Sequence, residues 1–299
     1  MDDKEYYSTV KRVLIIVLAL NILVTLAKGL YGWYTNSLSM ISDSIHSFFD
    51  STSNIIGIVG IIIASRPPDI RHPYGHSKYE TFASLGIAIL LFITCFEILQ
   101  SAMDRFLNPT TPEISIISFL IMGITIAINI GVSVYENRKG HEIKSNILIA
   151  DSLHTRSDIY VSLAVVLGFF VIQLGYVIAD PIIAIIIAIL IAKMGFEIIK
   201  ESSGVLLDKT AIDKEIIKEI VNSNRGVEDS HKIRTRGSAS HIYVDLHIIL
   251  DSCYSLDEAH IIAHEVENSL KSRIPEIKDV VVHLDPCENQ NQEQTGTNN

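Results

Sequence analysis

Long apolar segments constrain this chain most, because only helices and closed barrels can satisfy the backbone inside a bilayer. Six such segments fall within residues 1–200, and each has the ~20 residues that a helix needs to cross ~30 Å of hydrocarbon. Polar turns separate them, and prolines at Pro67 and Pro109 end two of them. The expected fold class is an α-helical membrane protein with six transmembrane helices, at residues 12–34, 37–64, 79–103, 114–135, 146–174 and 178–199.

Basic residues are distributed unevenly between the two sides that six spans define. With the N-terminus inside, Arg105 is the basic residue of the outer loops, and all others near the spans lie inside. Because cytoplasmic loops carry an excess of Lys and Arg, both termini are expected in the cytoplasm and the protein in a cell (inner or plasma) membrane. No cleavable signal peptide is predicted, and residues 1–10 are expected to be loosely ordered. The inner residues are Lys4, Lys11, Arg12, Arg66, Arg71, Lys78, Arg138, Lys139, Lys144 and Lys200.

The character of the sequence changes after Lys200. Residues 201–299 carry 10 Lys and Arg against 18 Asp and Glu, a balance that disfavours nucleic acid as a partner. Their periodicity predicts a cytoplasmic α+β domain of order αββαβ, ferredoxin-like in type. The expected domains are 1–207 in the membrane, 208–287 in the cytoplasm and a disordered tail at 288–299. The expected cytoplasmic elements are helices 213–224 and 256–274 and strands 231–236, 241–250 and 278–284.

One pattern, D-S-(I/L)-H-x-x-x-D, occurs at residues 43–50 and again at 151–158. In each copy the His and the second Asp are four residues apart, so a helix presents them on one face about 6 Å from each other. Both histidines lie about 14 to 15 Å along antiparallel spans, near the middle of the bilayer. Ionisable groups at that depth are costly and usually functional. Two imidazoles and two carboxylates suit tetrahedral zinc, so the predicted site for a transported metal is His46, Asp50, His154 and Asp158.

The same residues have a purely structural interpretation, in which each His–Asp pair only holds the bundle together. Repetition of the pattern at matched depth favours a shared metal site. Asp43 and Asp151 lie three residues before each histidine. They are expected either to fix the imidazoles by hydrogen bonds or to lie on the path of the ion.

Two further groups of metal-binding residue types lie outside the predicted spans. Asp69, His72 and His76 fall within eight residues of one loop, enough for three ligands, although a plain basic cytoplasmic loop is an equal alternative. The cytoplasmic domain is rich in histidine, which suggests metal binding there, while His241 and His264 are expected to be solvated. No HExxH motif occurs, so a zincin-type protease is not indicated. The expected ligands in this domain are His231, His247, His260, His283 and Asp285.

Together these features resemble the cation diffusion facilitators, and among them the YiiP-type bacterial zinc efflux proteins. The likeness covers about residues 8 to 288. It rests on the paired HxxxD motifs, on the loop His72-Pro-Tyr-Gly-His76-x-Lys78-x-Glu80, and on the ending His283-Leu-Asp285-Pro-Cys287. Any one of these motifs alone would be unspecific; their combination is not.

The resemblance implies a homodimeric metal/proton antiporter, not an enzyme, that exports Zn²⁺ by alternating access. It assigns the three groups above to a transport site, a loop site and a two-metal site that joins the cytoplasmic domains of the dimer. Lys78 and Asp208 match a charge pair that links the membrane and cytoplasmic parts at the dimer interface. The chain departs from YiiP-type members at His46, where they often carry Asp. This favours zinc, with cadmium and cobalt as alternatives, over iron or the carboxylate-only manganese pattern.

Two other classes of protein remain as rivals. A membrane metalloenzyme would need several His clusters near one membrane face, whereas the predicted spans contain only His46 and His154. A metal sensor with a simple membrane anchor would not need charged groups inside two spans. Metal accumulation in cells with and without the protein distinguishes export from either rival.

Overall fold

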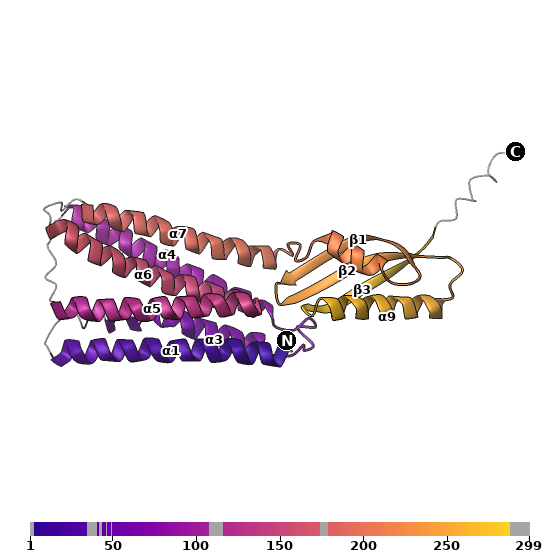
Figure 1. The fold of residues 1–299 in the computed structure, drawn as a ribbon, viewed down its shortest axis with the longest axis horizontal. Helices are drawn as coiled ribbons and strands as arrows, with labels where there is room; N and C mark the ends of the chain where they lie inside the picture. Colours follow the sequence, from indigo (N-terminus) through magenta and orange to yellow (C-terminus); the bar gives the residue numbers. More distant parts are fainter. Residues whose placement is uncertain are drawn as a thin grey trace. The chain divides into compact units, whose positions relative to one another are not determined.

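The computed structural model describes residues 3–34, 41, 44–45, 47–48, 50–107, 116–173 and 179–287 (Figure 1). The chain divides into two compact units, Met1–Ser203 and Gly204–Asn299. Asp43 and His46 of the first motif copy lie outside the described residues, as does the predicted tail at 288–299.

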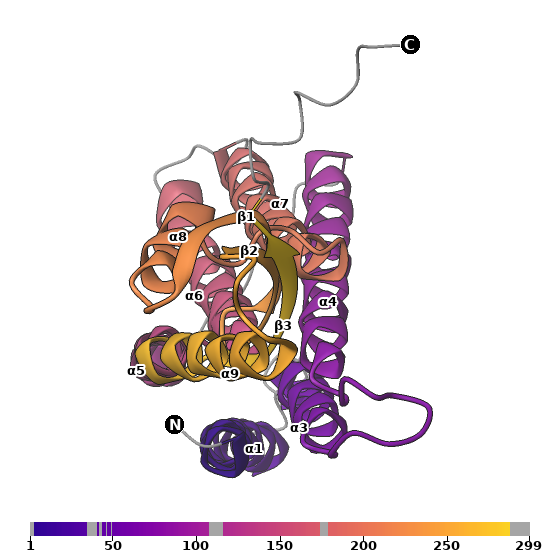
Figure 2. The same cartoon turned by 90° about the vertical axis from the view of Figure 1, so that its right-hand side faces the viewer.

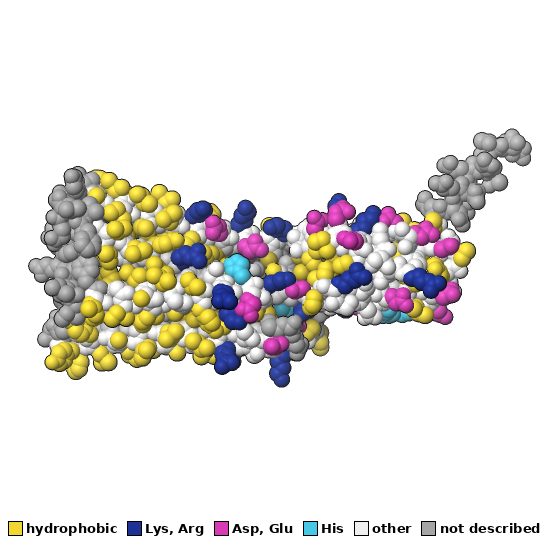
Figure 3. Space-filling model, viewed as in Figure 1, with side chains coloured by type: hydrophobic (Ala, Val, Ile, Leu, Met, Phe, Trp, Pro, Cys, Tyr) yellow, Lys and Arg dark blue, Asp and Glu magenta, His cyan; other side chains and the backbone are white. Residues whose placement is uncertain are grey.

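The first unit is a bundle of helices that run alongside one another (Figures 1 and 2). Four segments are long and apolar enough to cross a membrane: Asp3–Tyr31, Lys78–Leu107, Leu120–Ile143 and Pro181–Leu206. Large apolar side chains such as Leu23, Phe96 and Ile189 point outward, as contact with lipid requires, and Figure 3 displays this apolar surface on one face. Its described helices are α1 (Asp3–Tyr34), α3 (Thr52–Ala64), α4 (Lys78–Leu107), α5 (Ile116–Ile143), α6 (Asn146–Gln173) and α7 (Ala179–Leu206), the last of which continues past the unit boundary.

The other two predicted spans differ from these four. The predicted span 37–64 is described mainly from residue 50 onward, where α3 has 13 residues. The predicted span 146–174 corresponds to α6, a helix of 28 residues that carries Asp151, Arg156 and Asp158. The described residues therefore contain a helical membrane unit with four spans of ordinary apolar composition.

The start of the chain is helical, so the expectation of a loosely ordered segment at residues 1–10 is wrong. α1 begins at Asp3, and Tyr6 and Val10 are buried in the core of the bundle. The tyrosine hydroxyl donates to the Glu80 carboxylate on α4 at 2.9 Å. A polar segment can thus continue a helix when one of its faces packs on its neighbours.

Glycines let α3 lie close against its neighbours. A Cβ added at Gly60 would lie 2.3 Å from the Ala83 Cβ on α4, and one at Gly57 would lie 3.1 Å from a Leu14 methyl on α1. Small residues permit such close helix packing in membranes. This packing fixes the position of α3 and thereby of Asp50, two residues before its start.

The second unit has the predicted order αββαβ: α8 (Lys214–Asn222), β1 (Val227–Ser238), β2 (His241–Leu250), α9 (Leu256–Arg273) and β3 (Ile277–Pro286). The sheet order is β1-β2-β3, with β1 antiparallel and β3 parallel to β2. α9 forms the crossover that a parallel pair requires. Both helices cover the same side of the sheet (Figure 2).

From Ile242 onward, burial alternates along β2. Leu246 and Ile248 are buried in one core with Val266 and Leu270 of α9. His247, between them in sequence, therefore points to the opposite face, away from the helices. This alternation decides which histidines of the unit can meet.

Candidate metal centres

The structure brings together three of the four predicted membrane ligands. One ligand atom each of Asp50, His154 and Asp158 lies within 4.8 Å of the others. α6 presents His154 and Asp158 one turn apart, and Asp50 reaches them from the segment before α3. His46 is outside the described residues.

His154 is buried in a way that fits a ligand. Its side chain is 3% exposed, and neither ring nitrogen has a hydrogen-bond partner within the described part of the chain. A buried polar group without a partner costs about 1–3 kcal/mol. An ion placed between the imidazole and the two carboxylates would remove that cost.

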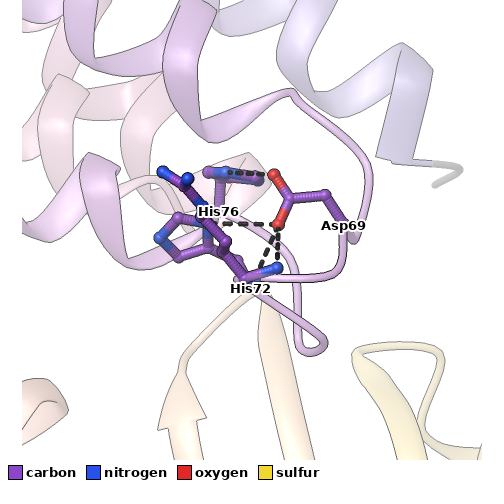
Figure 4. A network of polar contacts seen from close by, with 4 residues as sticks. Asp69, His72 and His76 are labelled. Carbon is purple, nitrogen blue, oxygen red and sulfur yellow. Dashed lines mark hydrogen bonds and ion pairs between the residues drawn. The ribbon is translucent and has the colours of Figure 1, made fainter.

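The loop residues also come together (Figure 4). Asp69 Oδ1 accepts from the backbone N–H of His72 at 2.6 Å and of Arg71 at 2.8 Å, while Oδ2 lies 3.6 Å from His76 Nε2. The His72 backbone hydrogen bond is the main cause of the lowered pKa of Asp69. Ligand atoms of Asp69, His72 and His76 lie within 4.8 Å of one another. This arrangement offers one oxygen and two nitrogens to a cation.

Four of the five residues predicted as ligands in the second unit form one cluster on the sheet. Strand register places His231 opposite His247 and His247 opposite His283. Asp285 Oδ2 lies 2.9 Å from His247 Nδ1 and 3.1 Å from His231 Nε2, and its Oδ1 lies 3.2 Å from His283 Nε2. The hydrogen bond with His247 is the main cause of the lowered pKa of Asp285. We name these four residues the strand cluster.

His260 is not part of the strand cluster within the chain. It lies on α9, which covers the other side of the sheet, and its Nε2 is 3.2 Å from Nε2 of His264. His264 is exposed, as expected. The expectation that His241 is solvated is wrong: its side chain is 6% exposed, and its Nδ1 lies 3.0 Å from the Ser240 hydroxyl.

Two family profiles match nearly the whole chain. Residues 14–207 match the cation efflux transmembrane domain, and residues 210–287 match the cytoplasmic domain of cation efflux proteins. The chain belongs to the cation efflux family. It is accordingly a membrane cation efflux transporter of the cation diffusion facilitator type rather than an enzyme, and the family binds divalent metals.

Relatives of this cation efflux protein match along most of their length. "Uncharacterized transporter MJ0449" of Methanocaldococcus jannaschii is 36% identical over 92% of this chain and 98% of its own. "Cation-efflux pump FieF" of Shewanella oneidensis is 30% identical over 87% and 88%. "Manganese efflux system protein MneP" of Bacillus subtilis is 29% identical over 92% and 96%. A solved "MamM-CTD" structure is 23% identical over 24% of this chain and 92% of its own, with a TM-score of 0.24.

Around the predicted membrane ligands of this cation efflux protein, the structure also places buried polar residues that the sequence interpretation had not singled out. Asn54 on α3 accepts from Asn21 on α1 at 2.8 Å and donates to Asp151 on α6. Glu136 on α5 is fully buried and accepts from the Thr155 hydroxyl at 3.3 Å. Asp151, predicted either to orient an imidazole or to lie on the ion path, is thus held by α3. In the sequence, Asn54 and Glu136 are distinguished only as polar residues at the end of a long apolar segment.

Glu80, quoted in the loop motif without a role, joins three helices of the transporter. It is 5% exposed, and its Oε1 accepts from Tyr6 at 2.9 Å and from the Ser145 hydroxyl at 2.7 Å. α1, α4 and the start of α6 therefore meet at one carboxylate. Lys78 and Asp208 belong to different units, and their pairing stays a prediction.

Proposed function

We propose that this protein is a Zn²⁺/H⁺ antiporter that exports zinc from the cytoplasm, with His46, Asp50, His154 and Asp158 as the transport site. The observation that carries the proposal is the buried His154 imidazole, whose nitrogens lack a partner among the described residues although two carboxylates lie within ligand distance. Six spans with cytoplasmic termini, at the positions predicted from the sequence, complete the transport domain 1–207.

Coupling follows from competition at one site. Zinc binds neutral imidazole and ionised carboxylate, so metal binding expels protons and protonation expels metal. Histidine is the side chain whose unperturbed pKa lies near physiological pH. An imidazole can therefore be neutral in one compartment and protonated in a more acidic one. An inward-facing state loads Zn²⁺, and an outward-facing state exchanges it for protons.

The ligand types favour zinc over harder ions. Imidazole with carboxylate suits zinc, cobalt and cadmium, whereas manganese prefers oxygen-only sites. The relatives include a manganese efflux protein and a cation-efflux pump FieF. Flux therefore has to be compared across several metals. Zinc is the proposed substrate, and cadmium and cobalt are the next candidates.

The cytoplasmic domain 208–287 is proposed to regulate a homodimer. The strand cluster supports metal binding there, and the loop residues Asp69, His72 and His76 support a second regulatory or loading site. Lys78 and Asp208 are proposed to form the charge pair between the domains. The tail 288–299 is proposed to be disordered.

Flux in proteoliposomes tests the antiport. Zinc uptake into vesicles should rise when the vesicle lumen is made more acidic than the outside medium. His154→Ala or Asp158→Asn should reduce this uptake to the level of empty vesicles. His141→Ala is the matched control, because His141 is exposed and its Nδ1 lies beside the Asn137 carbonyl. Zinc flux that ignores the pH gradient would refute the coupling, and wild-type flux in His154→Ala would remove the site. A panel of Zn, Cd, Co, Fe and Mn identifies the substrate.

A further inference from the structure

One face of α1 carries three polar side chains. Asn21, Thr25 and Lys28 recur at helical spacing, and the last two are buried. On the opposite face, Leu26 and Leu30 are 56% and 65% exposed. α1 therefore turns a lysine into the helix bundle, although a charged side chain at such a place is costly and is usually functional.

The Lys28 ammonium does not behave like that of an ordinary lysine near a helix end. Such a side chain usually extends along the helix until its charge reaches water. Lys28 lies six residues before Tyr34, the last residue of α1, but it is only 6% exposed and its Nζ donates to the Ser47 hydroxyl at 3.0 Å. The charge is thus directed toward the segment that carries the first copy of the repeated pattern.

Close packing of α1 against this segment fixes the position of the lysine. The Ser44 hydroxyl donates to the backbone carbonyl of Thr25 at 3.0 Å. Gly29 permits this approach, because a Cβ added there would lie 2.8 Å from the Ser44 hydroxyl oxygen. The Lys28 ammonium is therefore held beside Ser47, the next residue in sequence after a predicted metal ligand.

The same ammonium acts on the proposed transport site. Electrostatic attraction links Lys28 to the Asp158 carboxylate. That carboxylate lies within ligand distance of His154 and Asp50. A fixed positive charge stabilises free carboxylates and opposes a second cation that approaches them, and both effects are stronger in a buried site than in water.

We propose that Lys28 is a built-in counter-cation that sets the metal affinity of the transport site, an inference that rests on the proposed function. In the metal-free state the ammonium partly neutralises the two carboxylates. A bound divalent ion competes with this charge, so it is held less tightly and leaves more readily. Lys28 is not itself a ligand, because an ammonium has no lone pair to offer to a metal.

The zinc dependence of uptake into proteoliposomes, at one fixed pH gradient, tests the proposal. Lys28→Met keeps the length of the side chain and removes its charge. It should lower the half-saturating zinc concentration by about tenfold. The maximal rate should fall as well, because a tightly held ion leaves slowly. Lys28→Gln removes the charge and keeps a hydrogen-bond donor for Ser47, so it should shift both quantities in the same direction. Lys28→Arg keeps the charge and should stay close to the wild type.

A control and a second measurement separate charge from packing. Lys193→Met removes a lysine of α7 that is 73% exposed, and it should change neither quantity. Loss of a purely structural lysine would instead raise the half-saturating concentration or unfold the protein, which circular dichroism detects. Zinc titration of the full-length protein in detergent is the second measurement. The binding component that is absent in His154→Ala should be tighter in Lys28→Met than in the wild type.

An unchanged or raised half-saturating concentration in the neutral variants would overturn the proposal. An equal shift in Lys28→Arg would do the same, because charge would then not be the cause. Failure of the proposed function is a separate outcome. If wild-type vesicles transport another divalent metal of the panel instead of zinc, the comparison is made with that metal, since the repulsion acts on every divalent cation.

Discussion

Asn54 is a neutral side chain, fully buried between helices, that connects α1 to Asp151 on α6. Asn54→Ala should leave the Asp151 carboxylate without its donor and destabilise the protein by about 1.5–3 kcal/mol, the range for hydrogen bonds to charged groups. Because Asp151 is one turn from His154, zinc affinity should fall as well. Unfolding of the purified protein and zinc titration measure the two effects.

The control for this prediction is Asn268→Ala, which removes an exposed amide on α9. Its stability and zinc affinity should match those of the wild type. If Asn54→Ala were equally silent, the amide would not support the metal site.

The residues proposed as ligands could be picked out at the residue scale, whereas the polar residues that surround them could not. His154 and Asp158 carry their chemistry in their type and spacing, and the second copy of the pattern gives them a partner. Asn54 and Glu136 carry no such pattern. Which group an isolated buried amide or carboxyl meets depends on how the helices pack, and one sequence does not contain that information.

At the scale of elements, the packing of α3 against α4 places Asp50. Gly60→Ala would bring a methyl group into the Ala83 side chain, since the added Cβ would lie 2.3 Å from the Ala83 Cβ. Overpacking of this kind costs about 1–3 kcal/mol. The two helices should separate, and both the stability of the protein and its zinc affinity should fall, as unfolding and zinc titration would record.

Gly131→Ala on α5 is the matched control, because nothing lies within 4 Å of a Cβ added there. In a helix interior this change is neutral or stabilises by up to about 1 kcal/mol. Equal behaviour of the two variants would mean that close approach of α3 and α4 is not required for the site.

Elements of the cytoplasmic unit could be predicted more completely than the grouping of its histidines. Periodicity gave the order αββαβ, and β2 matches its predicted range 241–250. Whether His260 meets the strand residues depends on which side of the sheet α9 covers. The burial of His241 likewise depends on tertiary packing, which composition does not indicate.

For the whole molecule, the change from membrane to cytoplasmic character near residue 200 is the most predictable feature, because lipid and water select different surfaces. The number of spans is less clear from composition, since charged residues lower the apolar character of α6. The charged residues that suggest a function for α6 also reduce the hydropathy by which a membrane span is identified. Asp151, Arg156 and Asp158 account for this in α6.

Zinc should also control the assembly of the whole molecule. If ions at the strand cluster join the cytoplasmic domains of two subunits, zinc binds the dimer more tightly than the monomer and shifts the equilibrium toward the dimer. Asp285 contacts His231, His247 and His283, so Asp285→Asn should weaken every metal contact of the cluster at once. Sedimentation of the full-length protein in detergent should show a zinc-dependent rise in dimer for the wild type and for His141→Ala, and none for Asp285→Asn. A dimer fraction that stays constant across zinc concentrations in the wild type would separate the strand cluster from assembly and leave it a role in metal binding alone.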